Sequence, residues 1–318
     1  MKKILMIFIF CFIFVSCNNS SKNEGNDSMN NFIIYTNEKG NTVLEEKNPV
    51  FNVNYTPNVI YANKGGIDLS LQILTPKLKR NDTNSKYPLV LFIQGSRWMK
   101  QNVYQNLVVM GDFARRGYVV SIVEYRPSDK AIFPAQIEDT RDAINFMINN
   151  ANKYNIDTNN VFVWGSSSGA HTALFTAIPL SDNDNTIPYM NAIIAYYPPT
   201  DILEMRNDPL QSTTGDAESP EGILIGRKNV YDFPEEAKKA SPYYEISKAN
   251  NLPPIFLAHG DADSVVPFSQ SKILADKLKE ENRVYEFYTV KNADHSDWQF
   301  WTKDMFDVVE NFIKKYKK

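Results

Sequence analysis

The chain has few cysteines and histidines and no excess of basic charge. Its 318 residues include two cysteines, Cys11 and Cys17, and three histidines. The formal net charge of −3 disfavours nucleic acid as a partner, because nucleic-acid binding usually requires a basic face. No internal repeat is visible, so the signature of a repeat protein is absent. With 43% hydrophobic and 13% aromatic residues, the chain has enough apolar side chains for a sizeable core.

The first residues have the pattern of an export signal. Two lysines precede an apolar stretch from Ile4 to Val15. This stretch is shorter than the roughly 20 residues of a transmembrane helix, but it fits the apolar region of a signal peptide. The segment Phe14-Val15-Ser16-Cys17, where this stretch ends, resembles the lipobox of bacterial lipoproteins, with Phe14 where leucine is usual. We therefore expect residues 1–17 to be a lipoprotein signal, with Cys17 as the lipidated N-terminus.

Lipidation of Cys17 predicts a protein held at the bacterial cell envelope by its lipid anchor only. A plain secretory signal is the alternative, and it predicts a secreted or periplasmic protein. Cleavage also removes Cys11, so no cysteine remains for a disulfide. Residues 18–57 are expected to form a tether and N-terminal extension, because their first part is rich in Asn, Ser, Gly and charge. The main domain is then predicted over residues 58–318.

Strand and helix patterns alternate along this main domain. The predicted strands are Val59–Asn63, Ile67–Thr75, Pro88–Gln94, Tyr118–Tyr125, Val161–Trp164, Asn191–Tyr197, Ile255–Ala258 and Val284–Val290. The predicted helices are Val103–Arg116, Pro134–Tyr154, Ser168–Ile178, Ser269–Asn282 and Trp298–Tyr316. Such alternation favours a mostly parallel sheet with helices on both faces. Residues 200–251 break the pattern with prolines and glycines. An insertion of this kind is typical of a lid or binding loop, and a surface excursion without function is the alternative.

The most informative segment is residues 161–171, Val-Phe-Val-Trp-Gly-Ser-Ser-Ser-Gly-Ala-His. A strand-like run ends in Gly-x-Ser-x-Gly and enters a helical pattern, which is the context of a nucleophile elbow. Gly165 and Gly169 flank Ser167, and without Cβ atoms they let the strand and helix approach closely. An ordinary loop of small residues is the alternative. The flanking strand and helix patterns favour Ser167 as a nucleophile.

A serine hydroxyl needs a general base to become a nucleophile. His171 lies in the first turn of the helix after Ser167 and cannot easily face it, so we expect it to pack or cap. His259 ends a strand and is expected to be structural. His295 follows the last predicted strand, at the same sheet edge as Ser167. We therefore predict that His295 is the base.

The base in turn needs an acid to orient it, and two aspartates qualify by position. Asp261 and Asp263 lie between Ser167 and His295, after a strand that ends at the same edge. Either one gives the chain order Ser, Asp, His. The acid would accept the Nδ1 hydrogen of His295 and stabilise the imidazolium. The other aspartate is expected to satisfy the backbone of its own turn.

An oxyanion hole requires backbone N–H groups aimed at the developing negative charge. One donor is expected from Ser168, which follows the nucleophile. The other is expected from the loop after the strand at 88–94, with Ser96 as first choice and Arg97 next. Trp98 and Trp298, together with Trp301, are candidates for the walls of a sugar or aromatic acyl pocket. Packing within the core is the alternative for all three.

Six segments that occur in one order carry a family resemblance. They are Gly95–Trp98, Glu124–Arg126, Phe133–Asp139, Gly165–His171, His259–Pro267 and Ala293–His295. Together they resemble the α/β-hydrolase carboxylesterases that include bacterial feruloyl and acetyl xylan esterases, near the hormone-sensitive-lipase-like esterases. The resemblance covers about residues 59–316. The family motif His-Gly-x-x-Asp-x-x-Val-Pro falls on Asp263 and leaves Asp261 as the turn residue.

The chain departs from this family at two places. Related esterases often carry His-Gly-Gly in the oxyanion loop, where this chain has Gln94-Gly95-Ser96. A backbone donor survives that change, although the geometry of the loop is then not fixed by the motif. In the elbow, Ser168 and Ala170 stand where alanine and glycine are common. Ser168 is compatible with the expected role because it acts through its N–H.

The resemblance implies an α/β-hydrolase fold and the hydrolysis of carboxylic esters through an acyl-enzyme, and the insertion at 200–251 would be its lid-like part. It implies no metal and no organic cofactor. Acetyl or feruloyl esters on plant polysaccharide fragments are the candidate substrates. One alternative is a serine aminopeptidase of prolyl-oligopeptidase type, because the segment 259–267 is shared with those catalytic domains, which usually follow a large propeller. Another is a non-catalytic binding protein on a hydrolase scaffold.

Overall fold

The computed structural model describes residues 32–46, 51–78, 82, 84–205 and 215–318. The chain divides into two compact units, Met1–Pro49 and Val50–Lys318. In the first unit, β1 (Phe32–Thr36) and β2 (Thr42–Glu46) pair as an antiparallel hairpin. The predicted signal segment with Cys17, and the tether up to residue 31, lie outside the described residues. Within the described ranges, no helix is both long and apolar enough to cross a membrane.

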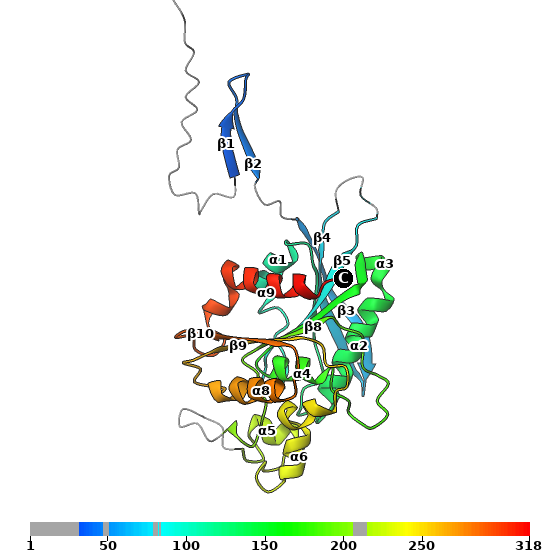
Figure 1. The fold of residues 1–318 in the computed structure, drawn as a ribbon. Coiled ribbons are helices and arrows are strands. Elements are labelled where there is room, and N and C mark those ends of the chain that lie inside the picture. Colours follow the sequence, from blue (N-terminus) through cyan, green and yellow to red (C-terminus); the bar gives the residue numbers. More distant parts are fainter. Residues whose placement is uncertain (1–31, 47–50, 79–81, 83, 206–214) are drawn as a thin grey trace, which may run out of the picture. The chain divides into compact units, whose positions relative to one another are not determined.

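An eight-stranded sheet forms the centre of the described part of the second unit, in the order β10-β9-β8-β7-β5-β6-β4-β3 (Figure 1). Its strands are β3 (Val53–Lys64), β4 (Ile67–Pro76), β5 (Tyr87–Ile93), β6 (Val119–Val123), β7 (Ile156–Ser166), β8 (Ala192–Tyr196), β9 (Ile255–Gly260) and β10 (Tyr285–Val290). β3 and β4 form an antiparallel hairpin, and β4 also pairs antiparallel with β6. The other neighbours pair parallel. The predicted mostly parallel sheet is confirmed.

Helices cover both faces of this sheet, also as predicted (Figure 1). One face packs against α2 (Ala135–Asn149), α4 (Ser168–Phe175) and α8 (Phe268–Glu280). The other face packs against α1 (Leu107–Ala114) and α9 (Lys303–Tyr316). The short helix α3 (Ala151–Tyr154) precedes β7. Because successive side chains of a strand point to opposite faces, Leu91 of β5 joins the first core and Phe92 joins the second.

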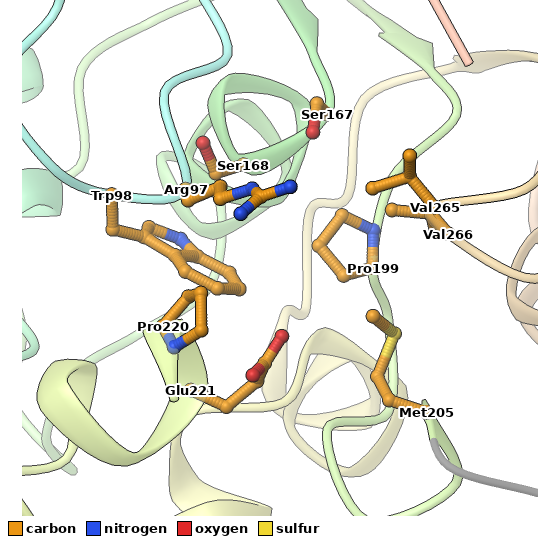
Figure 2. A pocket seen from close by; sticks show the side chains of 10 residues that line it. All are labelled: Arg97, Trp98, Ser167, Ser168, Pro199, Met205, Pro220, Glu221, Val265 and Val266. Atoms are coloured by element: carbon orange, nitrogen blue, oxygen red, sulfur yellow. The ribbon is translucent and has the colours of Figure 1, made fainter. Parts of the chain in front are cut away.

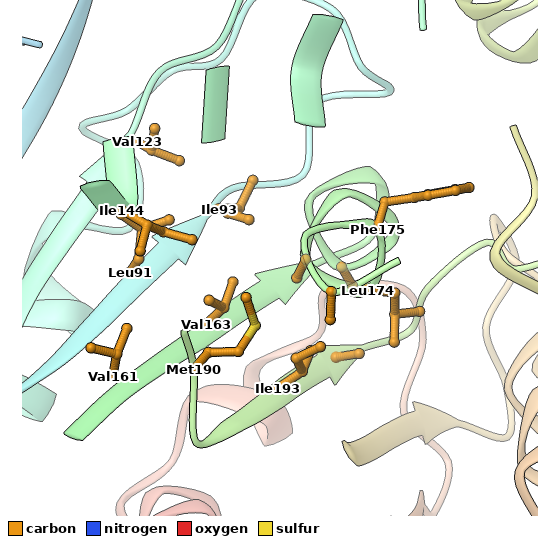
Figure 3. Close-up of a cluster of buried hydrophobic side chains, with 14 of the residues drawn as sticks. Leu91, Ile93, Val123, Ile144, Val161, Val163, Leu174, Phe175, Met190 and Ile193 are labelled. Carbon is orange, nitrogen blue, oxygen red and sulfur yellow. The ribbon is translucent and has the colours of Figure 1, made fainter. Parts of the chain in front are cut away.

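The central strands and α4 bring the elbow segment into the core. Figure 3 shows Val163 of β7 and Ile193 of β8 beside Leu174 of α4, in one buried cluster with Leu91. All of these side chains are fully buried. Burying an apolar side chain of this size contributes about 1.5–3 kcal/mol each. The packing therefore fixes the strand and the helix on either side of Ser167, and with them the position of the turn between.

The stretch predicted over 134–154 divides into α2 and α3, and the helices predicted over 103–116 and 298–316 are the ones that shorten most. The stretch predicted over 103–116 becomes helical only at Leu107, because Asn102 and Asn106 favour turns over helix interiors. The stretch predicted over 298–316 divides into the 3₁₀ turn η3 (Trp298–Trp301) and α9. Thr302 separates them, since its side chain accepts a hydrogen bond from the N–H of Met305 and caps α9.

The insertion at 200–251 is more regular than its composition indicated. Its described residues contain α5 (Pro220–Leu224), α6 (Pro234–Lys239), α7 (Pro242–Glu245) and the 3₁₀ turn η2 (Ile246–Lys248). A proline opens each of the three α-helices, where its missing N–H has no consequence. The prolines that were interpreted as breakers therefore start helices. Leu224, Val230 and Ala237 form a small core with Trp98, which fastens the insertion to the main domain.

Candidate active site

Ser167 occupies a strained turn between β7 and α4. Its backbone has φ 54° and ψ −128°, a region that non-glycine residues adopt at a cost and that is common at functional sites. A Cβ added to Gly165 would lie 2.2 Å from the carbonyl oxygen of Gly169, and one added to Gly169 would lie 2.1 Å from that of Ile93. The expected close approach of strand and helix is confirmed, and only glycine permits it.

The structure brings Ser167, His295 and Asp263 into one hydrogen-bonded row. His295 Nε2 lies 3.0 Å from Ser167 Oγ, and His295 Nδ1 lies 2.8 Å from Asp263 Oδ2. Asp263 is buried, whereas the His295 side chain is 15% exposed. With Nδ1–H donating to the carboxylate, Nε2 is left to accept the proton of the serine hydroxyl. This arrangement is the one required for nucleophilic attack by serine.

Asp263 is held as a carboxylate by four groups. Its Oδ1 accepts hydrogen bonds from the N–H groups of Val265 and Val266. Its Oδ2 faces His295 Nδ1 and, at 3.3 Å, Nε2 of His259. Burial raises the pKa of the Asp263 carboxyl, but the hydrogen bonds from His259 and His295 outweigh it, and the pKa lies well below its ordinary value. The group therefore stays charged beside His295.

Asp261 has a different position. It accepts hydrogen bonds from Lys291 Nζ and from the backbone N–H of Asn292, each at 2.6 Å. These contacts join the ends of β9 and β10 and do not reach His295. Asp261 is therefore the turn residue of the pair.

The other two histidines have the structural roles that the sequence predicted. His171 is buried, accepts a hydrogen bond from Trp98 Nε1 at Nδ1, and contacts the carbonyl of Ala240 through Nε2. Burial lowers its pKa to about 4.

His259 lies between Ser271 Oγ and the carbonyl of Val266. Its additional contact with Asp263 was missed.

The oxyanion loop is fastened to the elbow by side chains on both sides of the nucleophile. The N–H of Gly95 donates to Ser166 Oγ at 3.2 Å, and the N–H of Ser96 donates to Ser168 Oγ at 2.9 Å. The second bond corrects the prediction for Ser96, because that N–H already has an acceptor. The N–H groups of Arg97 and Ser168 have none among the residues that the structure describes. These two remain the candidate oxyanion donors.

Ser166 and Tyr125 are residues of the site that the sequence reasoning missed. The hydroxyl of Tyr125 lies 3.2 Å from Ser96 Oγ, which also donates to the carbonyl of Met99. Burial raises the pKa of Tyr125 to about 12, although hydrogen bonds to Ser96 and Ser168 oppose the shift. Tyr125 is therefore neutral and able to donate. Its signal in the sequence was only its place in the segment 124–126.

Two hollows meet at Ser167. The smaller is a cavity of about 80 Å³ lined by Arg97, Trp98, Ser167, Ser168, Pro199, Met205, Pro220, Glu221, Val265 and Val266 (Figure 2). The larger measures about 370 Å³ and shares Arg97, Ser167 and Val265 with the first. It adds polar side chains and His295. Ser167 therefore borders two hollows, and only the larger one is also lined by His295.

The three candidate tryptophans lie in different places: Trp98 in the wall of the smaller cavity, Trp298 at the surface and Trp301 against the core. Trp98 lines the smaller cavity, and its indole N–H is fixed by His171. The prediction for Trp298 is wrong, because its side chain is 69% exposed and lines neither hollow at Ser167 in the described structure. Phe300 takes the inward position of the same 3₁₀ turn. Trp301 packs against Trp164 and Phe92 in the core.

Within the described ranges, no three His, Cys, Asp or Glu side chains come together as they would around a metal ion.

Comparisons with known proteins point to one family. The model of the BD-FAE family matches residues 71–278, nearly two thirds of the chain. Esterase LipC of Mycobacterium tuberculosis is 25% identical over 214 residues, which cover 64% of this chain and 52% of that protein. A probable isoprenylcysteine alpha-carbonyl methylesterase of Oryza sativa subsp. japonica is 26% identical over 76% of this chain and 58% of its own length. The chain thus spans little more than half the length of these relatives.

Solved structures of esterases also resemble this chain. A truncated carbohydrate esterase from gut microbiota has a TM-score of 0.71 and 26% identity, over 85% of this chain and 98% of that chain. A bifunctional GH43-CE protein of Bacteroides eggerthii has a TM-score of 0.70 and 26% identity, over 83% of this chain and 38% of that one. A thermophilic esterase of Thermogutta terrifontis shares the fold at 22% identity and a TM-score of 0.64, over 84% and 94% of the two chains.

Proposed function

The chain belongs to the BD-FAE family and has the α/β-hydrolase fold, and from that premise we propose that it is a serine carboxylesterase. The observation that carries the proposal is the row of hydrogen bonds from Ser167 through His295 to Asp263. This row lies where the smaller cavity and the larger hollow meet. A binding protein on the same scaffold would need neither the strained backbone at Ser167 nor the buried carboxylate behind His295.

In the proposed reaction, Ser167 Oγ attacks the ester carbonyl and passes its proton to His295 Nε2. Asp263 stabilises the imidazolium that forms, because its pKa is held low and it stays charged. The N–H groups of Ser168 and Arg97 receive the negative charge on the carbonyl oxygen. His295 then protonates the departing alcohol, and an acyl-enzyme remains on Ser167. Water activated by His295 releases the acid in the same way.

We propose acetyl or feruloyl esters of plant polysaccharide fragments as substrates. Support comes from the BD-FAE family and from the two solved structures described as carbohydrate esterases. The larger hollow also offers the amides of Gln94, Gln105 and Asn106, which are suited to sugar hydroxyls.

We also propose that Cys17 carries a lipid and holds the esterase at the bacterial cell envelope. The basic and apolar start of the sequence and its lipobox-like end support this proposal. An enzyme anchored in this way would meet soluble polysaccharide fragments at the envelope.

The proposed function is tested by the kinetics of residues 18–318 against a Ser167→Ala variant. The substrates are p-nitrophenyl acetate, methyl ferulate, acetylated xylan and an alanyl-anilide. We expect ester hydrolysis by the wild type and a loss of about 10⁴-fold or more in the variant. Hydrolysis of the anilide alone would point to a peptidase. Equal ester turnover by both proteins would overturn the proposal.

A further inference from the structure

The smaller cavity at Ser167 ends at a buried carboxylate. Figure 2 shows Ser167 at one end of the cavity and Glu221 and Met205 at the other, with Trp98 and Pro199 between them. Glu221 lies on α5 of the insertion, and its carboxylate turns into the cavity. The residue is only 4% exposed. Sequence reasoning did not single it out, since it falls in the segment without a clear pattern.

The two hollows have different roles because His295 lines only one of them. His295 must protonate the oxygen of the leaving alcohol, and it borders the larger hollow but not the smaller cavity. The alcohol therefore belongs in the larger hollow. The smaller cavity has the candidate oxyanion donors Arg97 and Ser168 at its mouth. It therefore receives the acyl group.

The size and the end wall of the acyl cavity restrict what it can hold. Its volume of about 80 Å³ has room for roughly five to eight water-sized groups, since one water needs about 10–15 Å³. A longer apolar chain would press against the Glu221 carboxylate. The end wall therefore rejects such a chain by its shape.

We propose that the Glu221 side chain limits the length of the acyl group, so that the enzyme favours short acyl groups such as acetyl. This inference rests on the proposed function, because Ser167 delivers the acyl group to the cavity. It selects acetyl over feruloyl among the candidate esters, since an aromatic acyl group does not fit in front of Glu221. The specificity for short acyl groups then resides in the insertion and not in the hydrolase core.

The test measures kcat/KM for p-nitrophenyl acetate, butyrate and hexanoate in the full chain and in Glu221 variants. We expect the wild type to prefer acetate to hexanoate by well over tenfold, because each misfitting methylene costs about tenfold or more. Glu221→Ala opens the end of the cavity and should raise the hexanoate-to-acetate ratio by about tenfold. Glu221→Gln keeps the shape and should keep the wild-type ratio.

Glu218→Ala is the matched control, because Glu218 lies in the same segment but points to solvent and pairs with Arg227. It should leave the chain-length profile unchanged. Met205→Ala widens the same end without changing the carboxylate, and it decides the question if thermal unfolding shows that Glu221→Ala is not folded. It too should raise the ratio.

Three results would overturn the inference while ester turnover remains dependent on Ser167. These are a wild type that prefers hexanoate, a ratio that does not respond to either enlarging variant, and an equal shift in Glu221→Gln and Glu221→Ala. Absence of any turnover dependent on Ser167 in the wild type would overturn the proposed function itself, and the inference with it.

Discussion

At the scale of single residues, burial decides which of two identical side chains serves the site. Asp261 and Asp263 stand two positions apart in one loop. Asp263 is enclosed between two histidines and two backbone N–H groups, whereas Asp261 is partly exposed and bonded to Lys291. The sequence motif favoured Asp263 only through the family resemblance. The structure supplies the physical reason.

Asn substitutions of the two aspartates are therefore expected to differ sharply. Asp263→Asn keeps the shape but removes the charge and reverses the hydrogen bond to His295, so kcat for p-nitrophenyl acetate should fall by about 10⁴-fold. Asp261→Asn loses an ion pair at the surface, where such pairs contribute little to stability, and should retain nearly full kcat. Comparable losses in both variants, measured at saturating ester, would show that the acid has been misassigned.

His171 is expected to make the fold less stable in acid. Burial lowers its pKa to about 4, below the value of about 6.5 that an unfolded chain has. The unfolded state therefore takes up the proton first. The contribution of neutral His171 is complete above about pH 6.5 and is lost as the pH falls toward 4, where the folded protein also binds the proton. The loss amounts to about 3 kcal/mol.

His171→Gln isolates this effect, because glutamine offers a donor and an acceptor to Ala240 and Trp98 but does not titrate. Urea unfolding at pH 7 and pH 4.5 should show a fall in unfolding free energy that is about 2 kcal/mol larger in the wild type than in the variant. Parallel falls in the two proteins would mean that His171 is not the titrating group.

At the scale of secondary-structure elements, close contact between β5, β7 and α4 forms the elbow. This contact depends on glycine, since a Cβ on Gly169 would lie 2.1 Å from the backbone oxygen of Ile93. Backbone atoms cannot move aside as a flexible side chain can. The elbow is thus a property of three elements together and not of the turn alone.

Gly169→Ala should therefore destabilise the protein, by about 1–3 kcal/mol or more, and displace Ser167. Gly111→Ala is the matched control, because Gly111 lies within α1 with open space around it. Alanine is the better helix former, so this change should stabilise the fold by about 0.5–1 kcal/mol. Denaturant unfolding of both variants checks the pair, and a neutral Gly169→Ala would contradict the packing account.

The strands and helices that the sequence predicted well are those in which apolar residues recur at one regular spacing. The buried strands and the amphipathic helices of the main domain are of this kind. The insertion was misread because a proline at 220, 234 or 242 starts a short helix, and composition alone does not distinguish a starting proline from a breaking one. Ser96 was misassigned as an oxyanion donor because its N–H donates to Ser168 Oγ. This contact between residues far apart in the sequence is not visible in the sequence pattern.

At the scale of the whole molecule, the proposed lipid anchor and the candidate active site lie in different segments of the chain. The main domain carries Ser167, His295 and Asp263 on its core strands and loops, and the insertion closes the acyl cavity with Met205 and Glu221. The segment before the described residues supplies the predicted attachment. The proposed specificity for the acyl group and the proposed delivery to the envelope are thus separable from the proposed chemistry.

Anchoring is tested in bacterial cells that express the full chain. The wild type should incorporate a labelled fatty acid and sediment with membranes, whereas Cys17→Ala should do neither. Ester hydrolysis by the two proteins, solubilised in the same detergent, should be equal because Cys17 lies outside the catalytic domain. If the wild type takes up no label and stays in the soluble fraction, lipidation of Cys17 is ruled out and the alternative of a plain secretory signal remains.

The central claim is that Ser167 becomes covalently acylated, and labelling with a fluorophosphonate tests it most directly. Intact-mass and peptide mass spectrometry should show one adduct on the peptide that contains Ser167, with none in Ser167→Ala and much slower labelling in His295→Ala. An unlabelled, correctly folded wild-type protein, or an adduct on another serine, would contradict the account.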